Sequence, residues 1–184
     1  MAGSRIVLPM NETNLHSSRL ERLVGKISCE LISQEGDMRK VHLRDSAGIS
    51  KTLGIVRFAN VNGENLINAH RRIIKGDLLG KTLYEARIDF DKLYLGYVRV
   101  ELPDWLRKEF ANNATQGIAL FSRIFVNGTN GHEHNNLYAD VIEVIPPSLQ
   151  NDFVNVAPLL ADLEKGLEAM LLAAGIRNEN LNGN

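Results

Sequence analysis

The chain has 184 residues, of which 44% are hydrophobic and 23% charged, and its formal net charge is -1. This composition is typical of one globular domain, and the length allows a core without disulfides or structural metals. Lys and Arg are scattered along the chain and form no basic stripe, which argues against a nucleic-acid partner. A membrane partner is not expected either, because no apolar run approaches the length that crosses a bilayer.

The number of cysteines and the N-terminal residues indicate the cellular compartment of the protein. Cys29 is the only cysteine, so no disulfide framework can form within the chain, and a reducing compartment is favoured. The first residues lack the basic start and the long apolar stretch of a signal peptide. We therefore expect a cytoplasmic protein.

The first half of the chain predicts a helix followed by strands. After a polar segment over residues 1–14, leucines at near-helical spacing predict a helix that Gly25 ends. Residues 26–33 alternate apolar and polar side chains, as a strand with one buried face does. Residues 38–61 form two extended runs around the turn formers DSAG, which predicts an antiparallel hairpin.

The first arm of this hairpin carries a charge on its apolar face. Arg39 alternates in phase with Val41 and Leu43, so the three side chains share one face of the strand. Burying an unpaired guanidinium is costly. Arg39 must therefore either reach solvent at the strand end or meet a carboxylate or an anionic ligand.

The segment KGDLLGKTL, Lys75–Leu83, is similar to a phosphate-binding loop only at first sight. Three residues separate Gly76 from Gly80, where the Walker pattern needs four, and the preceding residues have helical rather than strand spacing. We interpret the segment as a joint between a helix around 66–74 and a second helix, with Asp77 as the N-cap of the second.

The second half predicts a further strand, a helix and a second hairpin. A strand around 93–100 precedes a helix that Pro103 starts, and residues 118–126 and 137–145 are rich in strand formers. His132 and His134 lie in the loop of that hairpin, where a solvated loop is favoured over a metal site. Residues 157–175 carry an apolar stripe typical of a long helix that Gly175 closes.

Glu143 is the counterpart of Arg39 in the second hairpin. It is the only charge in a row that otherwise holds apolar residues, and we expect desolvation to raise its pKa unless a close arginine lowers that pKa again. Arg39 and Glu143 could lie on one face of the sheet and line a pocket. The alternatives are a structural ion pair across the sheet, or surface positions if the register differs by one residue.

Four short motifs, in this order, resemble those of the chorismate pyruvate-lyase family and the related ligand-sensing domains of GntR-type regulators. They are RKVHL at 39–43, VRFANV at 56–61, GDLLGKTL at 76–83 and EVIP at 143–146. The resemblance implies an α+β fold in which an antiparallel sheet with flanking helices encloses a small pocket. It covers residues 15–147 as one domain and leaves an N-terminal segment, 1–14, and a C-terminal helical extension and tail, 148–184.

The family's activity, which the resemblance implies for this chain, is release of pyruvate from chorismate to give 4-hydroxybenzoate, without a cofactor or a metal. Three departures count against it: Lys40 stands where the family usually has Glu, Leu78 where Pro is common, and the extension has no counterpart. An alternative alignment gives the carboxylate role to Asp140. The implied site consists of Glu143 as the catalytic carboxyl, Arg39 on the ligand carboxylate, Arg57 as a second pocket arginine, the backbone of Leu79, and His16 from the first helix.

Two other functions remain open at this point. A non-catalytic, sensor-like protein of the same fold would bind a small aromatic acid without turning it over. A hot-dog protein acting on acyl thioesters would need the helix around 66–74 to be long and centrally buried. For the lyase and for the sensor-like protein the partner is a small carboxylic-acid ligand, and a spare apolar face on the C-terminal helix would favour a homodimer.

Overall fold

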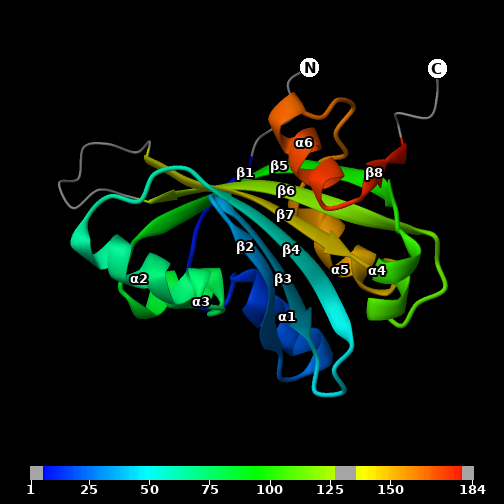
Figure 1. The fold of residues 1–184 in the computed structure, drawn as a ribbon, viewed down its shortest axis with the longest axis horizontal. Helices are drawn as coiled ribbons and strands as arrows, with labels where there is room; N and C mark the ends of the chain where they lie inside the picture. The colour runs from blue at the N-terminus through cyan, green and yellow to red at the C-terminus, as the bar shows by residue number, and fades with distance from the viewer. Residues whose placement is uncertain (1–5, 127–135, 180–184) are drawn as a thin grey trace.

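The structure is a computed structural model that describes residues 6–126 and 136–179. They form an eight-stranded antiparallel sheet in the order β1-β5-β6-β7-β4-β3-β2, with β8 paired to β5, and helices on both faces (Figure 1). The predicted α+β class with an antiparallel sheet is confirmed. The elements are β1 Ile6–Pro9, α1 His16–Val24, β2 Ser28–Glu35, β3 Met38–Arg44, β4 Ser50–Phe58, α2 Glu64–Ile74, α3 Leu79–Glu85, β5 Phe90–Glu101, α4 Asp104–Glu109, β6 Gln116–Val126, β7 Asn136–Ile145, η1 Pro147–Leu149, α5 Gln150–Phe153, η2 Val154–Val156, α6 Lys165–Ala173 and β8 Arg177–Asn178.

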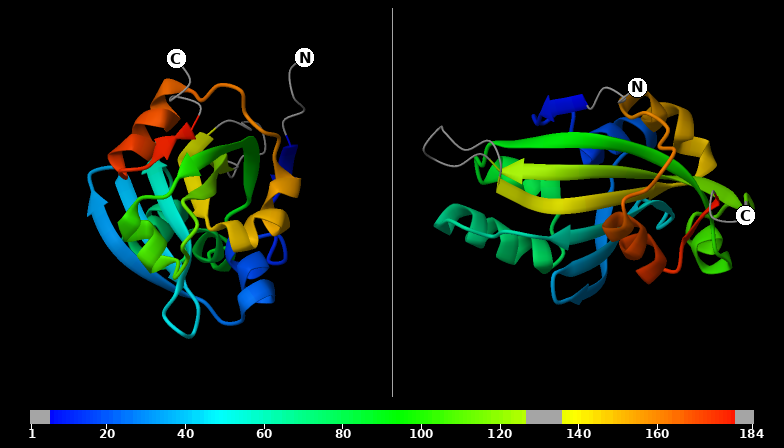
Figure 2. Two further views of the ribbon diagram at one scale, coloured as in Figure 1. Left: turned by 90° about the vertical axis from the view of Figure 1, so that its right-hand side faces the viewer. Right: turned by 90° about the horizontal axis from the view of Figure 1, so that it is seen from above.

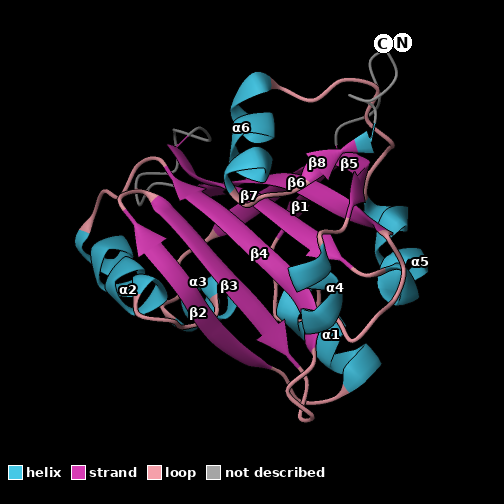
Figure 3. Cartoon of the chain, turned by 45° about the vertical axis from the view of Figure 1, so that its right-hand side comes forward, coloured by secondary structure: helices cyan, strands magenta, loops and turns pink. Residues whose placement is uncertain are grey.

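Both predicted hairpins are present, and the register between them decides which side chains share a face. Strand β4 lies between β3 and β7 (Figure 3). Arg39 of β3 lies opposite Val56 of β4, which in turn lies opposite Val141 of β7. Glu143 is two residues beyond Val141 and therefore points to the same side of the sheet. We call this side the inner face and the opposite side the outer face.

Helices cover the inner face in two groups. Helices α2 and α3 pack with Val56, Phe58 and Val141, while α1 and α5 pack with Val41 and Leu43 (Figures 1 and 2). The short α3 lies close to α1 because Gly80 has no side chain: a Cβ there would meet Leu15 Cδ2 at 2.9 Å.

The joint between α2 and α3 is confirmed, although its capping differs from the prediction. Asp77 does not cap α3, because its carboxylate accepts a hydrogen bond from Arg72 Nε at 2.8 Å and Leu78 occupies the N-cap position. Helix α2 buries Leu66, Ala69 and Ile73 and exposes the rest of its surface in part or in full. It is not the centrally buried helix that the hot-dog reading requires.

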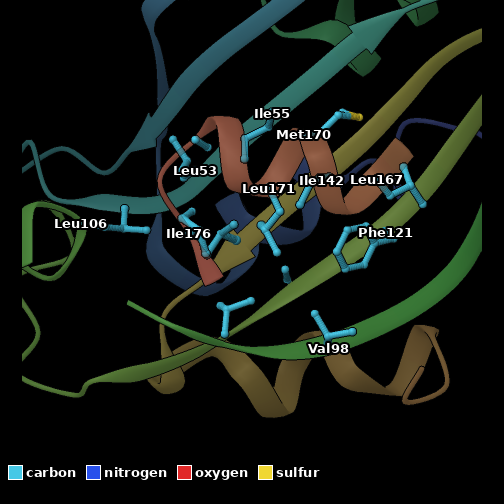
Figure 4. Close-up of a cluster of buried hydrophobic side chains, with 14 of the residues drawn as sticks. Leu53, Ile55, Val98, Leu106, Phe121, Ile142, Leu167, Met170, Leu171 and Ile176 are labelled. Carbon is cyan, nitrogen blue, oxygen red and sulfur yellow. The ribbon is translucent and has the colours of Figure 1, made fainter. Parts of the chain in front are cut away.

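The outer face is covered by α6. Leu167, Met170 and Leu171 of this helix join one hydrophobic cluster with Ile55 and Ile142 of the sheet (Figure 4). The apolar face that sequence analysis left spare is therefore packed on the sheet. Residues 148–179 complete the core in this structure, and they are more than an extension of a finished 15–147 domain.

The predicted long helix over 157–175 is wrong in its first half. Residues 158–160 run extended along β5, where Leu160 N donates to Tyr97 O at 2.9 Å, and α6 begins only at Lys165. Gly96 makes room for this crossing, since a Cβ there would lie 2.4 Å from Leu160 Cγ and its φ is +149°. None of the helices in the described ranges is long and apolar enough to cross a membrane.

Candidate functional site

A partly open cavity of about 90 Å³ lies where the two groups of inner-face helices meet. Most of its wall is apolar and comes from the sheet, from α1 and from the segment that begins α3. The polar side chains in this wall are the groups with which a ligand could form hydrogen bonds or ion pairs. They are His16, Ser17, Cys29, Arg39, Thr52, Lys92 and Glu143.

Arg39 lies in this wall with 1% of its surface exposed. Its Nη2 donates to the carbonyl oxygen of Asp77 at 2.7 Å and contacts Cys29 Sγ at 3.5 Å, while its Nε has no hydrogen-bond partner among the described residues. Burial lowers the pKa of Arg39, although the neighbouring Cys29 opposes that shift. No carboxylate of the described chain forms an ion pair with it. A buried guanidinium with a spare donor is suited to an anionic ligand.

Glu143 lies in the same cavity but has protein partners of its own. Lys92 Nζ donates to both carboxylate oxygens, at 2.9 and 3.0 Å, and His16 Nδ1 lies 3.4 Å from Oε2. Burial alone would raise the pKa of Glu143, but the charges and hydrogen bonds of His16 and Lys92 outweigh it and hold this pKa well below its usual range. The expectation of a raised pKa is therefore wrong, and Glu143 is a carboxylate rather than a proton donor.

Sequence analysis missed Lys92. Burial would lower the pKa of this lysine, but Glu143 and Tyr94 raise it above its ordinary value, so the ammonium stays charged. A signal was present in the sequence: Phe90, Lys92 and Tyr94 alternate on one side of β5, and Lys92 is the lone charge in that row. The same test that singled out Glu143 would have found its partner.

His16 reaches the cavity from the first turn of α1. Its Nε2 lies 3.0 Å from Thr52 Oγ1, and its ring packs against Phe153 with centroids 4.8 Å apart. Thr52 is fully buried in β4, and sequence analysis did not single it out. The two ring nitrogens of His16 thus face two different groups, Glu143 and Thr52.

The remaining predicted site residues divide between the two faces. Leu79 lines the cavity, as expected. The prediction that Arg57 lies in the pocket is wrong, because its Nη2 donates to Asp140 Oδ2 at 2.7 Å on the outer face. Asp140 also accepts a hydrogen bond from Arg123 Nε at 3.0 Å. The alternative alignment that gave Asp140 the carboxylate role therefore finds no support in its position.

No group of histidine, cysteine and acidic residues that could hold a metal is present in the described ranges. His132 and His134 lie outside those ranges. No family model matches the chain, and no curated protein was found to match it. The case for a function thus depends on the geometry of the cavity and its polar residues.

Proposed function

We propose that the protein binds a small organic acid in the inner cavity and acts on it as a chorismate pyruvate-lyase-like enzyme. The observation that carries the proposal is Arg39, buried to 1% exposure at the cavity wall, without a carboxylate partner in the described chain and with an unpaired Nε. An arginine fork matches a ligand carboxylate in shape and keeps its charge in a closed site. The motifs around Arg39 and Glu143 add the family's chemistry as an expectation.

In this proposal the ring carboxylate of chorismate binds Arg39. The reaction breaks the bond between the ring carbon and the enolpyruvyl oxygen, removes the neighbouring ring hydrogen as a proton, and makes the ring aromatic. The charged Lys92 stabilises negative charge on the departing oxygen, and His16 is the group that takes up and returns the proton. Glu143 remains ionised and orients both.

The volume of the cavity limits the ligand. An apolar cavity of roughly 150 Å³ holds a benzene ring, whereas this one measures about 90 Å³. A ring acid therefore needs outward movement of side chains such as Leu78 and Leu79 at the start of α3.

Binding without turnover is the second candidate, and one observation favours it. Lys92 already donates to both carboxylate oxygens of Glu143, the residue that the resemblance makes the catalytic carboxyl, so Glu143 has little capacity to exchange a proton with a ligand in that role. A site of this kind would hold a small aromatic acid and leave it unchanged.

One assay separates the two candidates. Purified protein is mixed with chorismate, and 4-hydroxybenzoate is followed by its ultraviolet absorbance, with Arg39→Ala and Glu143→Gln as variants and Arg99→Ala as the control at an exposed arginine of β5. The lyase proposal requires turnover that both cavity variants lose and the control keeps. Calorimetric binding of 4-hydroxybenzoate without any turnover would establish the second candidate instead. A protein that shows no turnover and no binding would reject both candidates.

We also propose a homodimer through the C-terminal residues, with the contact limited to the apolar side chains there that remain exposed. Since most apolar side chains of α6 pack on the sheet, such a contact would have to use exposed ones such as Leu172 and Leu159, which are 50% and 56% exposed. Sedimentation velocity of the wild type and of Leu172→Glu tests this. A monomer at all concentrations in both proteins would reject the dimer.

A further inference from the structure

Three buried residues of the cavity wall form a chain in the order carboxylate, imidazole, hydroxyl. Glu143 Oε2 of β7 lies 3.4 Å from His16 Nδ1, and His16 Nε2 lies 3.0 Å from Thr52 Oγ1 of β4. All three line the same cavity, and each is at most 9% exposed. They come from three separate elements, so no local turn or helix geometry accounts for their alignment.

The identity of the nitrogens gives this chain its chemical meaning. With the proton on Nδ1 directed at Glu143, Nε2 accepts the hydroxyl hydrogen of Thr52. A hydroxyl whose proton points at a base, which a carboxylate in turn orients, is the arrangement that activates a serine or threonine for attack on a carbonyl. The distance of 3.0 Å lies within the range for nucleophile and base.

We propose that Thr52 is a nucleophile toward esters of short carboxylic acids, an activity separate from the lyase reaction. Thr52 Oγ1 bonds to the acyl carbon while its proton moves to His16 Nε2. The bond from that carbon to the leaving oxygen breaks, and the leaving group keeps the electron pair and takes the proton from His16. Water then attacks the acyl-threonine, passes a proton through His16, and releases the acid and the free hydroxyl.

Two further features of the cavity fit this chemistry. The ammonium of Lys92 lines the same cavity, and its positive charge favours a negative tetrahedral intermediate there, while its N–H groups are directed at Glu143 and Tyr94. Without outward movement of the side chains at the start of α3, the volume of about 90 Å³ restricts the acyl group to a few carbon atoms. The substrate class is therefore a short acyl ester with a good leaving group.

The experiment uses the full chain and p-nitrophenyl acetate. Stopped-flow absorbance is expected to show a burst of p-nitrophenolate, and peptide mass spectrometry of the quenched protein is expected to place one acetyl group on Thr52. Thr52→Val, which keeps the shape and removes the hydroxyl, should lose both signals. Thr52→Ser should retain them, which separates loss of the hydroxyl from loss of folding.

Two variants complete the test. His16→Gln should slow acetylation by roughly 100-fold or more, the contribution expected of a positioned base. Thr82→Val is the matched control, because Thr82 is also a buried threonine but is not a lining residue of this cavity. The proposal is overturned if the wild type shows no burst, if Thr52→Val keeps it, or if the acetyl group is on Lys92 or Cys29. Chorismate turnover is measured on the same wild-type and Thr52→Val preparations. Because the lyase proposal does not use Thr52, the result for chorismate decides the lyase proposal independently of the result for the ester.

Discussion

Lys92 donates two hydrogen bonds to the carboxylate of Glu143, at 2.9 and 3.0 Å, across a strand that lies between them. The two residues come from β5 and β7, which are both neighbours of β6, and they are only 4% and 7% exposed. Two opposite charges removed from water in this way depend on each other, because neither can be solvated if its partner is lost. The pair therefore controls both the charge state of the cavity and the stability of the sheet around it.

Lys92→Met should destabilise the protein strongly. It leaves Glu143 buried with only His16 beside it, and breaking a buried pair from one side costs about 3–5 kcal/mol of unfolding free energy. Urea denaturation measures the loss, and Lys108→Met, at an exposed lysine of α4, should change stability by no more than about 0.5 kcal/mol. The double variant Lys92→Met/Glu143→Leu should recover most of the loss. A double variant less stable than the single one would contradict this account.

The same pair predicts how stability depends on pH. The pKa of Glu143 is lowered, so its contribution is complete above the unfolded value of about 4.3 and is lost as the pH falls through the folded pKa. The pKa of Lys92 is raised, so its contribution is complete below about 10.4 and is lost as the pH rises through the folded pKa. The difference in unfolding free energy between wild type and the double variant should shrink as the pH falls below the first value and as it rises above the second. A difference that stays the same at both extremes would refute the assignment.

The two candidate pocket arginines should differ in their effect on ligand affinity. A hydrogen bond to a charged group contributes about 1.5–3 kcal/mol, so Arg39→Met should weaken binding of 4-hydroxybenzoate by roughly 10- to 150-fold in titration calorimetry. Arg57→Lys should leave the affinity unchanged, because Arg57 lies on the outer face with Asp140. Equal losses in both variants would place the ligand somewhere other than the inner cavity.

Truncation of the α6 side chains should show that this helix belongs to the core. Met170 is 2% exposed in the outer cluster, so Met170→Ala should cost about 2–5 kcal/mol of unfolding free energy. Leu172→Ala is the control in the same helix at a half-exposed position, and its cost should stay near 0.5 kcal/mol. If Met170→Ala were equally mild, residues 148–179 would be an extension that the sheet does not need.

Alternation along strands made part of the site predictable from sequence. Arg39 and Glu143 each interrupt an apolar row, and the structure places both on the inner face and in one cavity. The sequence does not predict which residues pair with them, because side-chain pairing across a sheet depends on the order of the strands. The sequence does not state that β5 and β7 flank β6, and only that order brings Lys92 to Glu143.

The errors have identifiable causes. Motif resemblance places Arg57 in the pocket, whereas alternation along β4 puts it out of phase with Val56, an inner-face residue. The predicted helix over 157–175 is too long because leucine spacing alone does not reveal that Leu160 pairs with the backbone of β5. In the C-terminal helix a tertiary contact overrides the local pattern, whereas at Arg57 the local alternation is right and the motif resemblance is misleading.

Strand β7 carries an acidic residue for each side of the sheet, with Asp140 held by two arginines outside and Glu143 held by Lys92 inside. Inserting or deleting one residue ahead of Asp140 in β7 would turn each carboxylate to the opposite side of the sheet. Arg57, Arg123 and Lys92 would then all lose their carboxylate partners. Descendants of this gene can therefore vary the strand by substitution far more readily than by changes in length. In an alignment of homologous sequences, this constraint would appear as a β7 of constant length with two acidic residues three positions apart.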